Sequence, residues 1–157
     1  PTEWYSSVLL FIAGIHYAIM DVNRPSIETE IQIRYSDWFL TTPLLLVAFA
    51  KRYNVSNCIL KWWIVYDVGM IASGYYYEMY KDQRFWVVGV LMYILLLRGI
   101  FQTVGRNRIV IRYFVFGWAG YGMVSLLPRK NRSIYYNILD FYNKFMFSID
   151  LKKEEQM

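Results

Sequence analysis

The sequence predicts an all-α membrane protein built as a bundle of six transmembrane helices. The 157-residue chain is 57% hydrophobic and 20% aromatic, which exceeds what soluble domains of this size usually contain. Its apolar residues gather in six stretches that short polar segments separate. Each stretch is expected to be a helix, because backbone groups in a bilayer must bond within their own segment. Residues 1–157 should form a single domain, since no Pro/Gly/Ser-rich linker interrupts them.

The apolar stretches cover residues 4–20, 38–50, 59–77, 85–101, 109–127 and 134–151. Several reach the length of about 17 to 20 residues that crosses a hydrocarbon core of about 30 Å. The second stretch reaches this length only if residues 31–39 extend it, which places Arg34 and Asp37 inside the membrane. The connections are expected at residues 21–30, 51–57, 81–84, 105–108 and 128–132.

The formal net charge of +5 does not indicate a nucleic-acid partner, because the basic residues form short clusters between apolar runs and no continuous stripe. The single cysteine, Cys58, excludes an intrachain disulfide and a multi-cysteine metal site, and no metal is expected.

Basic residues predict the orientation of the chain, since cytoplasmic loops of membrane proteins are enriched in them. Nine lie on the side of the C-terminus: Lys51, Arg52, Lys61, Arg98, Arg106, Arg108, Arg112, Lys152 and Lys153. Six lie on the other: Arg24, Lys81, Arg84, Arg129, Lys130 and Arg132. A multi-pass protein with a cytoplasmic C-terminus is therefore expected.

Five ionisable residues lie deep in apolar sequence: Arg34, Asp37, Asp67, Asp140 and Lys144. A bare charge in lipid costs at least a few kcal/mol, so each needs a partner. Asp140 and Lys144 are four residues apart on one helix face, and Arg34 and Asp37 are three apart on another. This spacing can bring two carboxylates against one amine, with Arg34 compensating the extra negative charge. The alternative is a set of interhelical salt bridges that only lock the bundle.

A buried lysine also suits covalent capture of a carbonyl ligand, because desolvation favours its neutral, nucleophilic amine. A protonated Schiff base on Lys144 would need a counterion, and Asp37 and Asp140 can supply it.

Several segments resemble the microbial (type 1) rhodopsins. The run Arg34-Tyr-Ser-Asp37-Trp38-Phe-Leu-Thr41-Thr42-Pro43-Leu-Leu45-Leu resembles the third-helix signature of that family. Tyr136-Asn-Ile-Leu-Asp140-Phe-Tyr-Asn143-Lys144 resembles its retinal-lysine helix. Phe116-Gly117-Trp118-Ala-Gly-Tyr121 is similar to the sixth helix of proteorhodopsin, and Asp67-Val-Gly-Met70-Ile-Ala-Ser73-Gly74 to the fourth helix of bacteriorhodopsin. More narrowly, the short loops and the Asn143-Lys144 pair resemble the rhodopsins of large algal viruses.

The resemblance implies that all-trans retinal is bound to Lys144 as a Schiff base. Asp37 would then be the primary counterion and proton acceptor, Asp140 the second counterion, and Arg34 the guard of the extracellular exit. Thr41 would hydrogen-bond the Asp37 carboxylate.

The other implied roles concern the ligand and the walls of its pocket. Trp38, Trp118 and Tyr121 would sandwich the polyene, and the lining would include Thr42, Leu45, Met70, Gly74, Ser125 and Asn143. Asp67 would pair with Thr42. In Ile15-His16-Tyr17, His16 resembles a histidine that contacts the counterion in the family. The alternative is that His16 lies at a helix end and only forms local hydrogen bonds.

The chain departs from the family in three ways. The resemblance implies that it contains helices two to seven of the seven-helix fold, so the first is expected to be either lacking from the numbered chain or replaced by another segment. Ala48 stands where pumps carry a carboxylic proton donor, so reprotonation from bulk water should be slow and pH-sensitive. Gly122 and Ser125 replace a proline and an aromatic residue and loosen the ring end of the pocket.

The expected function is light-driven outward proton transport, with no enzymatic activity. The alternatives are a light-gated cation channel of the viral type, a sensory photoreceptor with a short tail at residues 152–157, and a transporter with a buried ion-pair network. The partners would be the lipid bilayer, further copies in a homo-oligomer, and a transported proton or monovalent cation. Apolar Leu45 implies a green-absorbing pigment.

Overall fold

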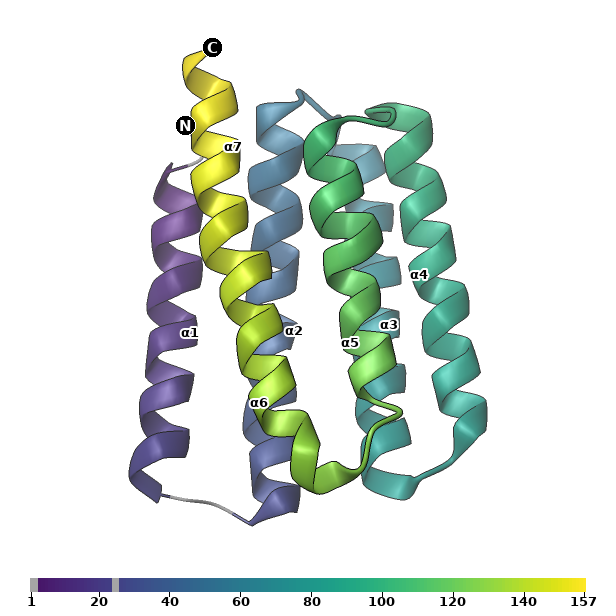
Figure 1. Cartoon of the computed structure of the whole chain (residues 1–157). Coiled ribbons are helices and arrows are strands. Elements are labelled where there is room, and N and C mark those ends of the chain that lie inside the picture. Colours follow the sequence, from purple (N-terminus) through teal and green to yellow (C-terminus); the bar gives the residue numbers. More distant parts are fainter. Residues whose placement is uncertain (1–2, 24–25) are drawn as a thin grey trace.

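In the computed structural model, which describes residues 3–23 and 26–157, six helical rods run side by side and no strand occurs among those residues (Figure 1). The first four rods are α1 (Glu3–Asn23), α2 (Ile27–Arg52), α3 (Asn57–Tyr80) and α4 (Gln83–Thr103). The fifth joins η1 (Val110–Gly117) to α5 (Trp118–Val124), and the sixth joins α6 (Arg129–Asp140), η2 (Phe141–Met146) and α7 (Phe147–Gln156). The predicted all-α bundle of six helices is confirmed.

Five of the six rods are longer than the sequence predicted, whereas the fifth ends at Val124, before the predicted boundary at residue 127. Polar side chains at the helix starts explain the greater length, because they satisfy backbone N–H groups that would otherwise lack partners. Ser26 accepts a hydrogen bond from the Thr29 amide at 3.3 Å, so α2 begins well before the predicted boundary at residue 30. Pro128 directly precedes α6, and most of the predicted connection 128–132 is therefore helical.

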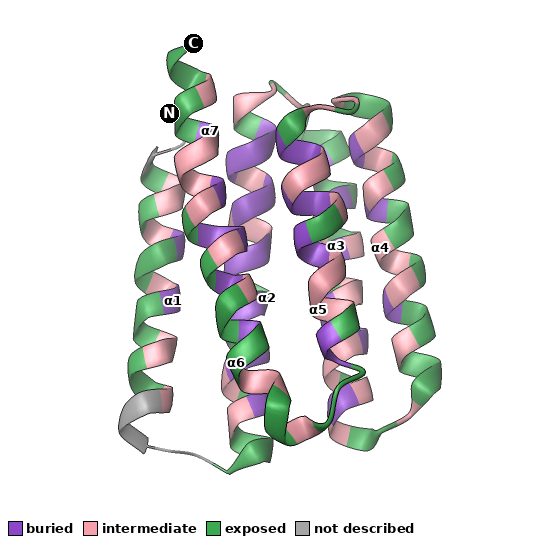
Figure 2. Cartoon of the chain, viewed as in Figure 1, coloured by how far each residue is buried: buried purple, intermediate pink, exposed green. Residues whose placement is uncertain are grey.

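Neighbouring rods along the chain run antiparallel, and the start of α1 and the end of α7 lie at the same end of the bundle (Figure 1). The connections α2–α3 and α4–η1 lie at that end too, so the basic residues counted together in the sequence gather there. Arg24, which was counted at the opposite end, lies outside the described residues. The helix α2 contacts α1, α3 and α7, and its buried face forms much of the bundle interior (Figure 2).

The bundle has polar groups inside and apolar groups outside. Among the described residues, the buried polar and charged side chains are Arg34, Asp37, Thr41, Thr42, Asp67, Ser73, Glu78, Ser125, Asp140, Asn143 and Lys144. Large apolar side chains on the outer faces are more than half exposed, among them Phe11, Leu40, Trp62, Leu91 and Phe116. Water would not favour this distribution, whereas lipid does.

Judged by length and apolar composition alone, one helix in the described ranges, Gln83–Thr103, qualifies as a membrane span, and a shorter apolar run covers Trp4–Met20. The other rods contain the buried polar and charged residues, which lower their average apolarity. Their outward faces remain apolar, so the bundle as a whole presents a lipid-compatible surface.

Two rods widen into π-helical turns where they face each other, at η1 and η2. Such turns displace backbone carbonyls from regular helical pairing, and side chains supply partners here. The Tyr93 hydroxyl lies 2.6 Å from the Phe114 carbonyl and 2.7 Å from that of Val115. The Asn143 amide donates to the Gly117 carbonyl at 3.0 Å, which ties the two widened segments together.

The close packing of α3 against α4 leads to a stability prediction. A Cβ at Gly99 would lie 2.9 Å from Nε1 of Trp63, whose side chain is buried, whereas a Cβ at Gly14 would meet no atom within 4 Å. We expect Gly99→Ala to lower the free energy of unfolding by about 1 to 3 kcal/mol, the usual cost of overpacking. Gly14→Ala should change it by no more than about 1 kcal/mol, in the stabilising direction. Thermal unfolding in detergent measures both, and equal stability of the two variants would contradict this packing.

Candidate functional site

The buried amine predicted from the sequence lies between two carboxylates. Lys144, in η2, is 3% exposed, and its Nζ lies 2.5 Å from Oδ2 of Asp37 and 3.7 Å from Oδ1 of Asp140. Asp37 comes from α2, while Asp140 ends α6 on the same rod as the lysine. The four-residue spacing of Asp140 and Lys144 thus puts both on the face that meets α2.

Asp140 has several further partners from three different rods. Its Oδ1 accepts hydrogen bonds from Trp38 Nε1 at 2.9 Å and from the Tyr121 hydroxyl at 2.8 Å. Its Oδ2 accepts one from the Tyr17 hydroxyl at 2.5 Å. Sequence reasoning missed Tyr17, because nothing distinguishes it from the other fourteen tyrosines of an aromatic-rich chain.

Asp37 has less hydrogen bonding than Asp140. Its Oδ1 is buried and has no hydrogen-bond partner among the described residues, although Nδ1 of His16 lies 3.3 Å away. That nitrogen lies closer to the carbonyl of Ile12, at 2.9 Å, and Nε2 of His16 is 3.1 Å from the Ser36 hydroxyl. Both interpretations of His16 therefore describe part of its surroundings, because it contacts the carboxylate and is also satisfied locally.

The prediction that Thr41 bonds the Asp37 carboxylate is wrong. The Thr41 hydroxyl donates to the Asp37 backbone carbonyl at 2.9 Å, since a threonine inside a helix readily reaches the carbonyl four residues earlier. Thr42 does the same to Trp38, and its Oγ1 also lies 2.7 Å from Oδ2 of Asp67. The predicted contact between Thr42 and Asp67 is therefore present, between α2 and α3.

Arg34 lies on the opposite side of Asp140 from Lys144. Its Nη1 is 3.5 Å from Oδ2 of Asp140, and its Nη2 donates to Glu30, Ser133 and Asn137 at 3.0 to 3.3 Å. The guanidinium is buried and makes no recorded contact with Asp37. It can offset the excess negative charge only through Asp140.

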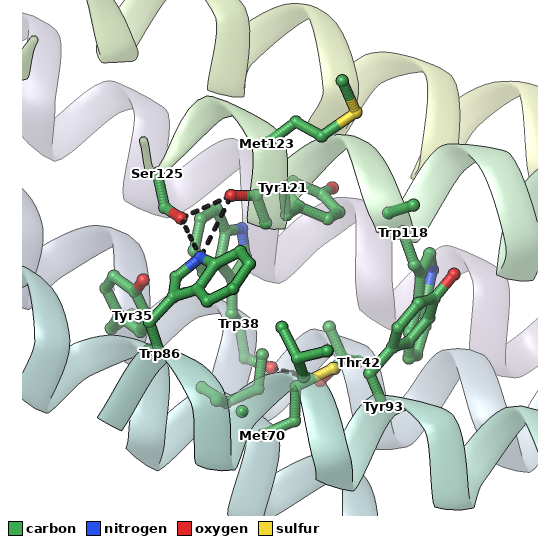
Figure 3. A pocket seen from close by; sticks show the side chains of 16 residues that line it. Tyr35, Trp38, Thr42, Met70, Trp86, Tyr93, Trp118, Tyr121, Met123 and Ser125 are labelled. Atoms are coloured by element: carbon green, nitrogen blue, oxygen red, sulfur yellow. Dashed lines mark hydrogen bonds between the residues drawn. The ribbon is translucent and has the colours of Figure 1, made fainter. Parts of the chain in front are cut away.

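Figure 3 shows an apolar cavity whose volume is about 240 Å³ and two of whose lining residues, Trp38 and Tyr121, also contact Asp140 of this charge cluster. Seven residues assigned to the pocket from the sequence line it: Trp38, Thr42, Met70, Gly74, Trp118, Tyr121 and Ser125. Trp38 and Tyr121 form its wall and also donate to Asp140, so the cavity is one side chain away from the carboxylate.

Three assigned residues do not line this cavity. Leu45 is buried in the core, Asn143 donates a hydrogen bond to the Gly117 carbonyl, and Lys144 forms an ion pair with Asp37. The rest of the wall includes four residues of α4 that no motif identified: Trp86, Gly89, Val90 and Tyr93. Trp86 Nε1 donates to the Ser125 hydroxyl at 3.1 Å and closes one end of the cavity (Figure 3).

The residues present fit an apolar aldehyde such as retinal. The cavity is lined mainly by aromatic and apolar side chains, and a buried primary amine lies behind its Trp38 wall. The amine has two acidic neighbours that can balance a positive charge on its nitrogen, and a buried lysine is a suitable partner for a carbonyl carbon.

Known proteins share this fold and sequence pattern. Residues 2–151 match the model of the bacteriorhodopsin-like protein family. A green-light absorbing proteorhodopsin of Gamma-proteobacterium EBAC31A08 is 26% identical, over 92% of this chain and 69% of the relative. A blue-light absorbing proteorhodopsin of Gamma-proteobacterium Hot 75m4 is 24% identical over the same shares.

Solved structures agree in fold. The viral rhodopsin OLPVRII superposes with a TM-score of 0.84 at 21% identity, over 97% of this chain and 80% of its own. The proton pumping rhodopsin AR2 of the marine alga Acetabularia acetabulum gives 0.79 at 23% identity, over 96% and 79%. The chain belongs to the bacteriorhodopsin-like family, whose members are retinal-binding integral membrane proteins.

Proposed function

We propose that this protein is a light-driven proton pump in which Lys144 holds all-trans retinal and Asp37 accepts the proton. The observation that carries the proposal is the 2.5 Å separation between Lys144 Nζ and Asp37 Oδ2 in a buried site next to an aromatic cavity. The names of several relatives, which are proteorhodopsins and a proton pumping rhodopsin, support it.

Retinal, when bound, supplies visible absorption and a change of shape on illumination. The residues of the chain do the rest. Lys144 anchors the ligand, while Trp38, Trp118 and Tyr121 form walls that orient it and exclude water. Asp37 takes a proton from the nitrogen of Lys144 onto Oδ2, the oxygen already within hydrogen-bond reach.

Asp140 stays a counterion in this scheme, because four donors stabilise its carboxylate: Tyr17, Arg34, Trp38 and Tyr121. Asp37 has an oxygen without a hydrogen-bond partner among the described residues, so it is the better proton acceptor of the two.

The direction of transport follows from the charges at the two ends. The end with the C-terminus holds the larger group of basic residues, which favours the cytoplasmic side, and Arg34 then faces the exterior. On the cytoplasmic side Ala48 is buried and carries no proton to give, so the amine must be reprotonated from bulk water. The transported proton leaves outward, and recovery is slow at high pH.

A light-gated cation channel is the second candidate. Ala48 favours it, because a protein without an internal donor is poorly suited to fast pumping, and Gly89 and Gly122 leave room beside the cavity. The structural match to a viral rhodopsin is consistent with either activity, since it concerns the fold alone.

Electrical recording separates these candidates. Illuminated cells under voltage clamp should show an outward current that keeps its sign across voltages and falls as the cytoplasmic pH rises or the membrane potential opposes it. Lys144→Ala should abolish the current and the visible band, while Lys51→Ala, which alters an exposed lysine at the end of α2, should keep both. A current that reverses sign with voltage identifies a channel, and no current at any voltage contradicts both candidates.

The absorption spectrum tests the role of Asp37. With retinal added, the protein should absorb green light, as the name of the green-light absorbing relative suggests. Asp37→Asn should move the band to the red and stop pumping, because the positive charge on the Lys144 nitrogen loses its nearest counterion. Asp67→Asn is the matched control, since Asp67 lies in the wall paired with Thr42 and should leave pumping intact. An unshifted band in Asp37→Asn is incompatible with this role.

The charge pair itself can be tested in protein prepared without retinal. Lys144→Ala leaves the Asp37 carboxylate buried without its opposite charge, and breaking a buried pair costs about 3 to 5 kcal/mol of folding free energy. The double variant with Asp37→Ala removes both charges and should be more stable than Lys144→Ala alone. Arg84→Ala, which breaks an exposed pair with Asp82, should have no measurable effect. Additive losses in the double variant would mean that the two residues do not interact.

A further inference from the structure

A second buried charge cluster lies at the end of the bundle that holds Arg34, and no role described above uses it. Glu78, near the end of α3, is 2% exposed and pairs with Nη1 of Arg132 at 2.8 Å. Arg129 donates to the backbone carbonyl of Glu78, so α6 holds this turn of α3 from two positions.

A small cavity of about 20 Å³ separates this pair from Arg34. Two isoleucines, Ile27 and Ile31, line it together with seven polar or charged residues: Glu30, Arg34, Glu78, Arg129, Arg132, Ser133 and Tyr136. Two of these side chains have a buried atom without a hydrogen-bond partner in the described part of the chain, Oε2 of Glu78 and the hydroxyl of Tyr136.

The cavity has the size and chemistry of a site for one water molecule. A buried water needs roughly 10 to 15 Å³ and two to four polar partners. Glu78 supplies an acceptor, Tyr136 a hydroxyl, and Arg34 and Ser133 line the same space. Leaving the two orphaned atoms dry would cost folding free energy, so water is favoured over an empty cavity.

We propose that one internal water occupies this cavity and links Glu78 to Arg34, so that Glu78 positions the Arg34 guanidinium relative to Asp140. Arg34 lies between two sets of negative charge, with Asp140 on the inner side and Glu30 and the cavity on the outer side. The pull from Glu78 limits how far Arg34 compensates the excess negative charge at Asp37 and Asp140. The spectroscopic consequence rests on the proposed retinal pigment, whereas the water site does not.

Removing the Glu78 charge should shift the visible absorption band in one definite direction. Without it, the balance of forces moves Arg34 toward Asp140, and the negative potential around the Lys144 nitrogen becomes weaker. The loss of a negative charge acts in the same direction through space. Both effects resemble a partial loss of counterion, so the visible band should move to the red by less than in Asp37→Asn.

The first experiment compares absorption spectra of retinal-loaded variants. Glu78→Gln should shift the band to the red, and Glu78→Asp should restore most of the original position because it keeps the charge. Tyr136→Phe keeps the ring stacked near Arg34 and the pair of Glu78 with Arg132, yet removes one water partner, so a smaller red shift is expected. This variant tests the link even where Glu78→Gln folds poorly.

Asp82→Asn is the matched control. It removes a carboxylate at the same end of the bundle that contacts Arg84 and not Arg34. The hydrogen bonds from Arg84 lower the pKa of the Asp82 carboxyl, so the control removes a full negative charge at neutral pH. Its band should stay in place, and unshifted bands in both Glu78→Gln and Tyr136→Phe would overturn the proposal.

The second experiment locates the water directly. A crystal structure that resolves internal waters should show density within hydrogen-bond distance of Glu78 Oε2 and the Tyr136 hydroxyl, and the Tyr136→Phe crystal should lose it. An empty cavity in the unmutated protein overturns the proposal whatever the pigment does. Absence of a visible band in the unmutated protein would count against the proposed pump, and the density would still decide the water site.

Discussion

The attraction between the buried Lys144 ammonium and the carboxylates of Asp37 and Asp140 sets the arrangement of this bundle. The amine lies 2.5 Å from one acid and 3.7 Å from the other, where lipid would otherwise penalise each charge by several kcal/mol. Because two acids face one lysine, a second cation is required, and Arg34 provides it from the far side of Asp140. The last rod and α2 are thereby joined at the depth where the aromatic cavity lies.

Because the charged side chains inside the bundle are paired with each other, the outer surface can consist mainly of apolar side chains. Charged side chains contact each other between the helices, and phenylalanine, leucine and tryptophan side chains are exposed on the outside. This explains why a helix such as α2, with Arg34 and Asp37 in its middle, belongs to a membrane bundle although its average composition is only moderately apolar. The apolar surface that suits lipid is a property of the assembled bundle more than of each single helix.

The sequence predicted the fold and the contact of Lys144 with both acids because charges within apolar runs are rare and their spacing fixes a common helix face. It did not predict Tyr17 or the α4 wall of the cavity, since one tyrosine or tryptophan among many carries no distinguishing pattern. Glu78 directly follows the predicted apolar stretch 59–77, where a charged side chain is expected to be exposed, and only packing against α6 revealed its burial. Thr41 was misassigned because its own helix offers a nearer acceptor.

The widened turns of the fifth rod have a mechanical consequence. The Tyr93 ring forms part of the cavity wall, while its hydroxyl lies within reach of the displaced carbonyls of Phe114 and Val115. A ligand that changes shape in the cavity would therefore push on the Tyr93 ring, and the Tyr93 hydroxyl is hydrogen-bonded to main-chain carbonyls of the fifth rod. Movement can pass from the cavity to the backbone through this uncharged side chain, independently of any proton transfer.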